Sequence, residues 1–289
     1  MRDSRFLPTS SVPSHFALGY DAWAPVDESG EHAGKVPPQR GSEERFRSKW
    51  LAALEGLPID RDYTHAYARW KKSLEASGSR LMELKFGSRL LVGHGNASAT
   101  EIGLTVHHTW GVPVIPGSSL KGLCAHYTVA TYGRQDEEGS VPPPFSGPKW
   151  DKDRRRIEGP PGDYYRGLFG APEVDRDSSA GLVTFHDALY VPDSIPGNRP
   201  FAVDVLTVHQ RSYYGQTDTS RKPGERWPND FDSPAPIGFI SVKPGTKFLL
   251  ALSAEEAWPA LACELLTEAI GTWGVGGKTS AAYGRTNRD

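Results

Sequence analysis

The sequence predicts an α+β fold in which an antiparallel, ferredoxin-like sheet is backed by two helices. Three observations predict it: strand-like runs recur between residues 81 and 252, two stretches carry apolar residues at helical spacing, and the order is strand, helix, strand, insertion, strand pair, helix. The 289 residues suffice for a sizeable core, and 31 glycines with 24 prolines indicate long irregular segments. We therefore expect one domain with long insertions.

The first 80 residues are expected to form an N-terminal arm and a helical extension. Residues 1–40 show no sustained period and hold several prolines, glycines and charges, which is typical of a loosely ordered arm. The aromatic residues of this arm, which are candidates for docking on a partner, are Phe6, Phe16, Tyr20 and Trp23. Apolar residues at helical spacing then predict two amphipathic helices, one from Ser42 to about residue 54 and one over about 63–74.

The first core strand and the first core helix are expected between residues 81 and 133. Residues 81–92 alternate in the manner of a strand, and the glycine-bearing turn 93–98 follows. A helix is expected to start at Ser118 or Ser119, whose hydroxyl would cap it. The apolar face of this helix consists of Leu120, Leu123, Cys124 and Tyr127.

The second half of the core follows a polar stretch. Residues 134–180 are rich in proline, glycine and charge, and they are predicted to be an inserted loop. The basic run 149–156 within this loop either binds phosphate or is a solvated surface loop. Residues 182–191 read as a strand, 201–215 as a further β-like stretch, and 216–236 as a polar, proline-rich segment.

The last core elements are a hairpin and a helix. Residues 238–252 are predicted to form two paired strands joined at 243–246. Ser253 and Glu256 have the spacing of a capping box, and the helix that follows is expected to end at Gly271.

Composition limits the possible settings of the protein. The formal net charge of −2 provides no global positive field, so any nucleic-acid site has to be local. Cys124 and Cys263 lie in apolar helical patterns, which favours packed thiols in a reducing cytoplasm over a disulfide or a metal pair. No run approaches 18 apolar residues, and the N-terminal residues lack the apolar core of a secretory signal, so we expect a cytoplasmic protein without membrane contact.

The most informative segment is the glycine-rich run 271–285, whose backbone N–H groups are candidates for contacting phosphate. It is not a Walker A loop, because Thr272 stands where a glycine is required and a helix precedes it. It is not a dinucleotide fingerprint either, because Thr279 stands at the third glycine position. The alternative is a closing turn that lets the chain pack tightly.

A second candidate anion site is the helix start within 114–122. Ser118, Ser119 and Lys121 place hydroxyls and a cation in the first helical turn, where backbone N–H groups attract anions. The alternative is a capped helix with a surface lysine.

Together, these two segments resemble the RAMP superfamily of CRISPR proteins, through residues 103–122 and 274–285. Within the superfamily, residues 107–122, 204–215 and 236–248 are similar to the sixth-subunit family of the type III-B (Cmr) complex. The resemblance implies an RRM-like, ferredoxin-like RAMP domain over 81–289, with insertions at about 134–180 and 201–236. It also implies a non-catalytic subunit that caps the backbone filament near the guide RNA 3′ end.

The resemblance further implies partners and site residues. The partners would be the guide crRNA, the target RNA, other Cmr-type RAMP subunits of the backbone and terminus, and a small helical subunit. The expected RNA-binding residues are Ser118, Ser119, Lys121, His107, His108, Gly274, Gly276, Gly277, Lys278, Thr279, Ser280 and Arg285. Part of 201–236 would form a thumb-like hairpin between guide and target.

Two other functions remain open on the sequence. A metal-independent endoribonuclease that processes guide RNA would use His107 or His108, with Lys121, Tyr283 and His209 as possible partners. Adjacent histidines on a strand point to opposite faces, so at most one of them would face a given site. A pure protein scaffold is the other alternative.

No metal or cofactor is expected. Several possible ligands lack a recognised spacing, namely His94, Glu101, His107, His108 and Asp187. Asp187 and Asp204 are interpreted as turn or hydrogen-bonding groups because no carboxylate partner is visible for either.

Overall fold

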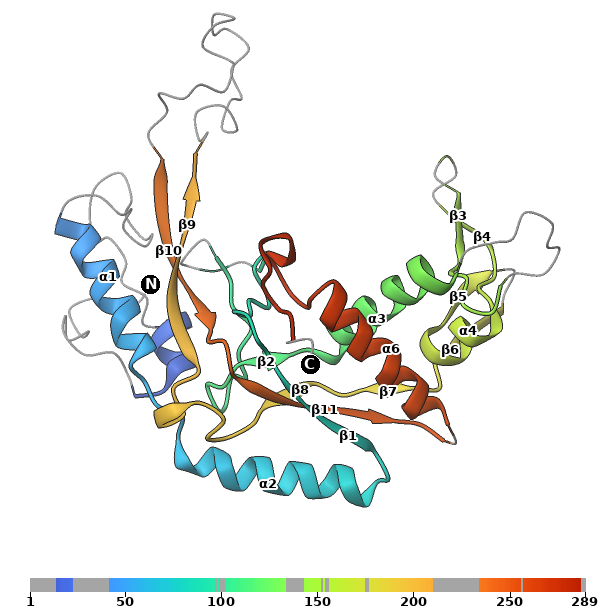
Figure 1. The fold of residues 1–289 in the computed structure, drawn as a ribbon, viewed down its shortest axis with the longest axis horizontal. Coiled ribbons are helices and arrows are strands. Elements are labelled where there is room, and N and C mark those ends of the chain that lie inside the picture. The colour runs from blue at the N-terminus through green and yellow to red at the C-terminus, as the bar shows by residue number, and fades with distance from the viewer. Residues whose placement is uncertain are drawn as a thin grey trace, which may run out of the picture.

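In the computed structural model, an antiparallel sheet lies between helices, and a two-stranded ribbon projects from it (Figure 1). The structure describes residues 14–22, 42–96, 98, 102–133, 143–151, 153, 156–174, 177–209, 234–255 and 257–286. The helices are the π-helix η2 (Leu18–Ala22), α1 (Ser42–Glu55), α2 (Arg61–Ala76), α3 (Gly117–Tyr132), α4 (Asp163–Phe169), the 3-10 helix η3 (Pro196–Asn198), α6 (Trp258–Thr272) and the 3-10 helix η5 (Thr279–Ala281). The strands are β1 (Arg80–Lys85), β2 (Val114–Ile115), β3 (Lys149–Asp151), β4 (Arg156–Gly159), β5 (Gly170–Val174), β6 (Asp177–Ala180), β7 (Thr184–Phe185), β8 (Ala188–Tyr190), β9 (Phe201–Val208), β10 (Ala235–Val242) and β11 (Lys247–Ser253).

The main sheet has the order β1-β11-β8-β2, with β7 also paired to β11, and all of these pairs are antiparallel. Helices α3 and α6 pack against each other on one face. Met82 of β1 points to that face, where its sulfur lies 3.7 Å from the Cys263 sulfur of α6. Both cysteines are free and buried, as predicted, and burial raises the pKa of the Cys124 thiol to about 12. The predicted α+β class with antiparallel sheets is confirmed.

Helix α2 covers the opposite face of the sheet (Figure 1). Because side chains alternate between the faces of a strand, Leu249 and Ala251 of β11 point away from α6 towards this face. Both side chains are buried. Tyr63 of α2 donates a hydrogen bond of 2.5 Å to the backbone carbonyl of Tyr190 at the end of β8. Neither face of the sheet is therefore open to solvent over these residues.

The tyrosines around α2 predict a loss of stability at alkaline pH. Burial raises the pKa of Tyr63, and it raises the pKa of both Tyr67 and Tyr190 to about 12. A pKa raised in the folded state means that folding favours the neutral phenol. The contribution of these tyrosines to the free energy of unfolding is therefore complete below the ordinary tyrosine pKa of about 10, and it is lost as the pH rises towards 12. We expect phenolate absorbance and loss of the far-UV circular dichroism signal to appear together in this window. In Tyr63→Phe, the unfolding free energy should vary less steeply with pH there.

The ribbon β9–β10 stands apart from the main sheet and rises away from it (Figure 1). This corrects the predicted hairpin over 238–252. Both of its strands and the turn at 243–246 exist, but β10 pairs with β9 while β11 pairs with β1. The turn therefore passes the chain from the ribbon to the sheet. The isolated bridge between Leu90 and Val242 is the point where the base of the ribbon meets the segment after β1.

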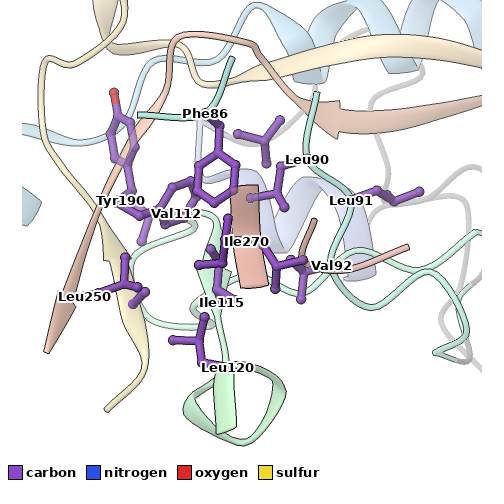
Figure 2. Close-up of a cluster of buried hydrophobic side chains, with 14 of the residues drawn as sticks. Phe86, Leu90, Leu91, Val92, Val112, Ile115, Leu120, Tyr190, Leu250 and Ile270 are labelled. Carbon is purple, nitrogen blue, oxygen red and sulfur yellow. The ribbon is translucent and has the colours of Figure 1, made fainter. Parts of the chain in front are cut away.

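Two other predicted strands are shorter than expected. The run 81–92 yields β1, which ends at Lys85, and its remainder leaves the sheet and continues as single bridges at Phe86 and Leu90. The run 182–191 is split into β7 and β8 because the carboxylate of Asp187 turns to the start of α3. The residues after β1 are still core, and Figure 2 shows Leu90 and Leu91 within the buried cluster.

The predicted capping box of the last helix is wrong. The N-cap of α6 is Ala257, without a side-chain hydrogen bond, and Glu256 lies outside the described residues. Ser253 is instead the last residue of β11, where its hydroxyl lies 2.6 Å from that of Ser79 and 2.7 Å from Nε2 of His186. The Ser253 hydroxyl therefore links the end of β11 to the residues next to β1 and β7. The helix itself ends at Thr272, one residue beyond the expected Gly271.

The segment 134–180 is more than the predicted loop. Its described part contains the ribbon β3–β4, the helix α4 and the ribbon β5–β6. Leu168 and Phe169 of α4 are buried in the main core. This part of the segment is thus an element of the packed structure, because α4 presents an apolar face to α3 and the sheet.

The N-terminal arm docks on its own chain in the described part, residues 14–22. Phe16 stacks on Phe201 at 3.6 Å between ring centroids, and the Tyr20 hydroxyl donates a hydrogen bond of 2.6 Å to the carbonyl of Ile102. The hypothesis that these two aromatics dock on a partner is therefore wrong, because both rings are buried here. Phe6 and Trp23 lie outside the described residues.

Candidate functional site

The glycine loop, defined as residues 274–285, follows α6 and is built on left-handed backbone. Three of its glycines have positive φ angles, and so do Lys278 and Ala282, at 60° and 65°. The N–H of Val275 donates a hydrogen bond of 2.9 Å to the carbonyl of Gly284, which closes the loop. The outer rim of the closed loop is exposed at Gly276 and Ser280–Ala282.

The inner side of this loop packs on the segment after β1. The N–H groups of Gly277 and Gly284 each donate a 2.7 Å hydrogen bond, to the carbonyls of Leu91 and Arg89 respectively. A Cβ on Gly277 would lie 2.8 Å from the Cβ of His94. These two N–H groups are therefore used within the protein. The closing-turn alternative therefore holds for the inner side of the loop, and phosphate contact by its exposed rim stays a prediction.

A polar cluster joins the glycine loop to the base of the ribbon. The Tyr283 hydroxyl donates a hydrogen bond to the Asp204 carboxylate of β9, and the Arg89 guanidinium lies 3.3 Å from the same carboxylate. Arg89 also donates to the Val203 carbonyl at 3.3 Å and to the Ser241 hydroxyl of β10 at 3.1 Å. Burial, together with the hydrogen bond to Asp204, raises the pKa of Tyr283 to about 12.

The cations of the glycine loop lie next to this cluster. The Lys278 ammonium is 5.9 Å from the ring centroid of Phe239, a buried residue of β10. Arg285 donates a hydrogen bond of 3.4 Å to the Thr279 carbonyl, while its Nε, like Nδ1 of His94, is buried without a hydrogen-bond partner among the described residues. Buried nitrogen atoms without partners are rare, and an anion is one group that would complete their hydrogen bonding.

The predicted caps of helix α3 are corrected by the structure. The N-cap is Pro116, without a side-chain hydrogen bond, and Ser118 and Ser119 lie within the first turn. The N–H of Gly117 donates a 2.7 Å hydrogen bond to the Asp187 carboxylate, which confirms Asp187 as a hydrogen-bonding group. The Gly117 N–H is therefore paired within the protein, and anion binding at Ser118, Ser119 and Lys121 stays a prediction.

Beside this helix start is a pocket of about 650 Å³ between α3, α4 and the β5–β6 ribbon. Ser118 and Lys121 line it, together with Tyr165, Phe169 and Phe185. None of the glycine-loop residues lines it. The structure therefore connects the glycine loop to the ribbon, while the helix-start residues face a separate pocket.

His107 and His108 face different surroundings. His107 is partly buried, which lowers its pKa, and the nearby charge of Asp187 opposes this shift. Burial raises the pKa of the Asp21 carboxyl, and the charge of the exposed His108 opposes this rise. The two histidines thus interact with different carboxylates. Neither histidine lies in a strand, so the expectation that at most one of them serves a given site stays a prediction.

Sequence reasoning missed Arg89 and the aromatic lining of the pocket. Arg89 occurs in a strand-like apolar run and belongs to no motif. Only its contact with Asp204, 115 residues later in the sequence, identifies it as part of the site. Tyr165 and Phe169 belong to the segment predicted to be a loop.

Among the described residues, no three potential ligands gather as a metal site, and no helix has the length and apolar character that crossing a bilayer requires.

Comparison with known proteins identifies the family. The sequence profile of the RAMP superfamily matches residues 83–287, which include the glycine loop, the helix start of α3 and the ribbon β9–β10. The chain belongs to the RAMP superfamily. The predicted resemblance to this superfamily is therefore confirmed.

Among RAMP superfamily relatives, the chain is 28% identical to CRISPR system Cmr subunit Cmr6 from Pyrococcus furiosus, with 78% of this chain and 72% of the relative covered. A chain in the cryo-EM structure of the type III-B Cmr-beta complex bound to cognate target RNA shares the fold. Its TM-score is 0.57 at 14% identity, over 88% of this chain and 78% of that one. The crystal structure of Cmr6 from Pyrococcus furiosus matches at 26% identity with a TM-score of 0.40, over 73% of this chain and 98% of that one.

Proposed function

We propose that this chain is a non-catalytic, RNA-binding subunit of a type III-B CRISPR effector complex. In that role it grips the sugar–phosphate backbone of the guide RNA and caps the filament of backbone subunits near the guide RNA 3′ end. The similarity to Cmr6 over most of both chains supports this placement. The observation that carries the proposal is the contact between the glycine loop and the base of the β9–β10 ribbon through Tyr283, Asp204 and Arg89.

This contact makes a loop and a projecting ribbon act on one RNA strand. A strand lying on the exposed rim at Gly276 and Ser280 would contact Lys278 and then meet the ribbon. The ribbon would act as the thumb that separates guide from target at this point, although residues 210–233 of the predicted thumb lie outside the described residues. Base pairing would supply the sequence specificity, as in other RNA-guided systems.

The covered sheet supports a loop-based grip. RRM domains stack bases on an open sheet face, but here α2 buries that face. We also infer that the sheet is ferredoxin-like, because the order β1, α3, β8, β11, α6 along the chain is followed by the bridge between Thr286 and Phe86 beside β1. The division into residues 1–80 and 81–289 stays a prediction.

Removing one glycine-loop cation tests the proposal. In the complex assembled with its other Cmr-type subunits and a small helical subunit, Lys278→Ala should weaken guide RNA retention equally for all guide sequences. The slope of log K against log salt should fall by about 0.7–0.9, because one phosphate contact is lost. Filter binding or fluorescence anisotropy at four salt concentrations measures both quantities. Lys121→Ala tests the α3 helix start in the same way.

The matched control is Lys72→Ala, because Lys72 is exposed on α2 at the opposite side of the sheet. It should leave the slope unchanged. An unchanged slope for Lys121→Ala and Lys278→Ala as well would favour the pure scaffold. RNA cut at a fixed position by the purified chain would favour the endoribonuclease.

A further inference from the structure

An arc of aromatic rings runs along the outer side of α3, α4 and α6. We define the aromatic arc by its members, which are Trp273, Tyr127, Tyr132, Phe145, Tyr164 and Trp258. Consecutive ring centroids lie 5.3, 6.5, 5.9, 5.2 and 6.1 Å apart. All of these spacings fall in the range of direct ring contact. The arc is thus one continuous surface, although it comes from four segments of the chain.

Much of this surface faces solvent. Trp273, Tyr132 and Tyr164 are 38%, 43% and 48% exposed, which places them among the most exposed large apolar side chains of the described residues. The core does not require these three rings, because α3 and α6 already bury Leu120, Leu266 and their neighbours. Contiguous exposed aromatics are typical of protein interfaces, where tyrosine and tryptophan supply much of the binding energy.

Among the described residues, three exposed carboxylates lie along the aromatic arc, and Arg166 is in the same helix as Tyr164. Tyr127 and Tyr132 donate hydrogen bonds of 3.4 and 2.7 Å to the Glu268 carboxylate, and Glu264 is exposed one turn earlier on α6. Asp163 is exposed beside Tyr164 at the start of α4. Helix α6 contains no lysine or arginine. Aromatic faces beside carboxylates attract guanidinium and ammonium groups and repel phosphate.

We propose that the aromatic arc docks a protein partner that presents arginine and lysine side chains, and that this partner is a neighbouring subunit of the same effector complex. The inference rests on the proposed function for the identity of the partner, while its chemistry follows from the arc itself. Trp273 directly precedes the glycine loop, so a subunit docked here would adjoin the RNA grip.

The experiment is co-expression of the full chain with the other subunits of its complex and with guide RNA, followed by native mass spectrometry. Glu264→Lys/Glu268→Lys should reduce the fraction of complexes that contain this chain by about tenfold at physiological salt, because like charges would then meet. Tyr132→Ala/Tyr164→Ala should weaken incorporation by about 10- to 30-fold through loss of stacking partners. Retention by the wild type should fall with added salt.

Controls separate assembly from folding. Glu75→Lys makes the same exchange at an exposed position of α2 and should assemble like the wild type. Glu264→Lys alone keeps the test valid if the Glu268 exchange lowers the melting temperature, because the Glu268 carboxylate holds two tyrosine hydroxyls.

The outcomes separate the two proposals. If the wild type assembles and both arc variants assemble equally well, the docking surface is refuted and the proposed function stands. If the wild type does not join the complex, both are refuted. If the arc variants assemble but lose crosslinks to RNA, the arc is an RNA surface and the protein-docking inference is overturned.

Discussion

Replacing Gly284 with alanine is expected to lower the free energy of unfolding by about 3 kcal/mol or more, since it combines left-handed strain with steric overlap. The φ angle of Gly284 is 69°, and an added Cβ would lie 1.9 Å from the carbonyl oxygen of Val275. The backbone cannot shift freely, because the Gly284 N–H donates to Arg89 and its carbonyl accepts from Val275. Urea unfolding followed by circular dichroism measures the loss.

Gly78→Ala separates the two causes. Gly78 has a similar φ of 72°, but an added Cβ would meet nothing within 4 Å. Only the conformational cost of about 1–2 kcal/mol should then appear. Equal losses in the two variants would show that the contact with Val275 is not close in solution, and the description of the glycine loop as a tightly closed turn would be wrong.

The helices were the most predictable part of the fold. Helices α1, α2, α3 and α6 occur where apolar residues recur at helical spacing, because this spacing is a local property of the chain. The strand pairing was less predictable. The residues of β10 and β11 have strand patterns and a good turn between them, yet their partners are β9 and β1. A local pattern indicates a strand but does not identify its neighbour.

The candidate site was predictable in its location and not in its internal contacts. The glycine content of 274–285 identified an unusual loop, and positive φ angles at Gly274, Gly276 and Gly284 explain that content. The carbonyl of Leu91 that accepts from Gly277 lies 186 residues earlier in the sequence. The hydroxyls of Ser118 and Ser253 were assigned to caps on local spacing alone. In the structure, Asp187 satisfies the start of α3, and Ser253 belongs to a strand end.

The docking position of an amphipathic helix is likewise a tertiary property. The apolar stripe of α2 was visible in the sequence, but whether it would meet the sheet or a partner was not. The structure places it on the sheet, where Tyr63 reaches the end of β8. This placement covers the sheet face, which leaves the loops for the proposed RNA contact.

Replacing Phe16 with alanine is expected to cost about 3 kcal/mol in unfolding free energy, because a buried aromatic side chain is lost. The Phe16 ring is 3% exposed and stacks between Tyr20 and Phe201, at 5.7 and 3.6 Å. Phe201 is the first residue of β9, so the contact joins residues 14–22 to the base of the ribbon. Hydrogen exchange should show lost protection in 14–22 and at the start of β9.

Leu18→Ala is the matched control, because Leu18 lies in the same short segment but is 42% exposed. It should change stability by less than about 0.5 kcal/mol, as surface substitutions usually do. If wild-type residues 14–22 exchange rapidly in the isolated chain and become protected only within the complex, these residues dock on a partner. If they are protected in the isolated chain and Phe16→Ala alone removes that protection, the arm is part of the subunit's own core and holds the ribbon in place before any RNA or partner binds.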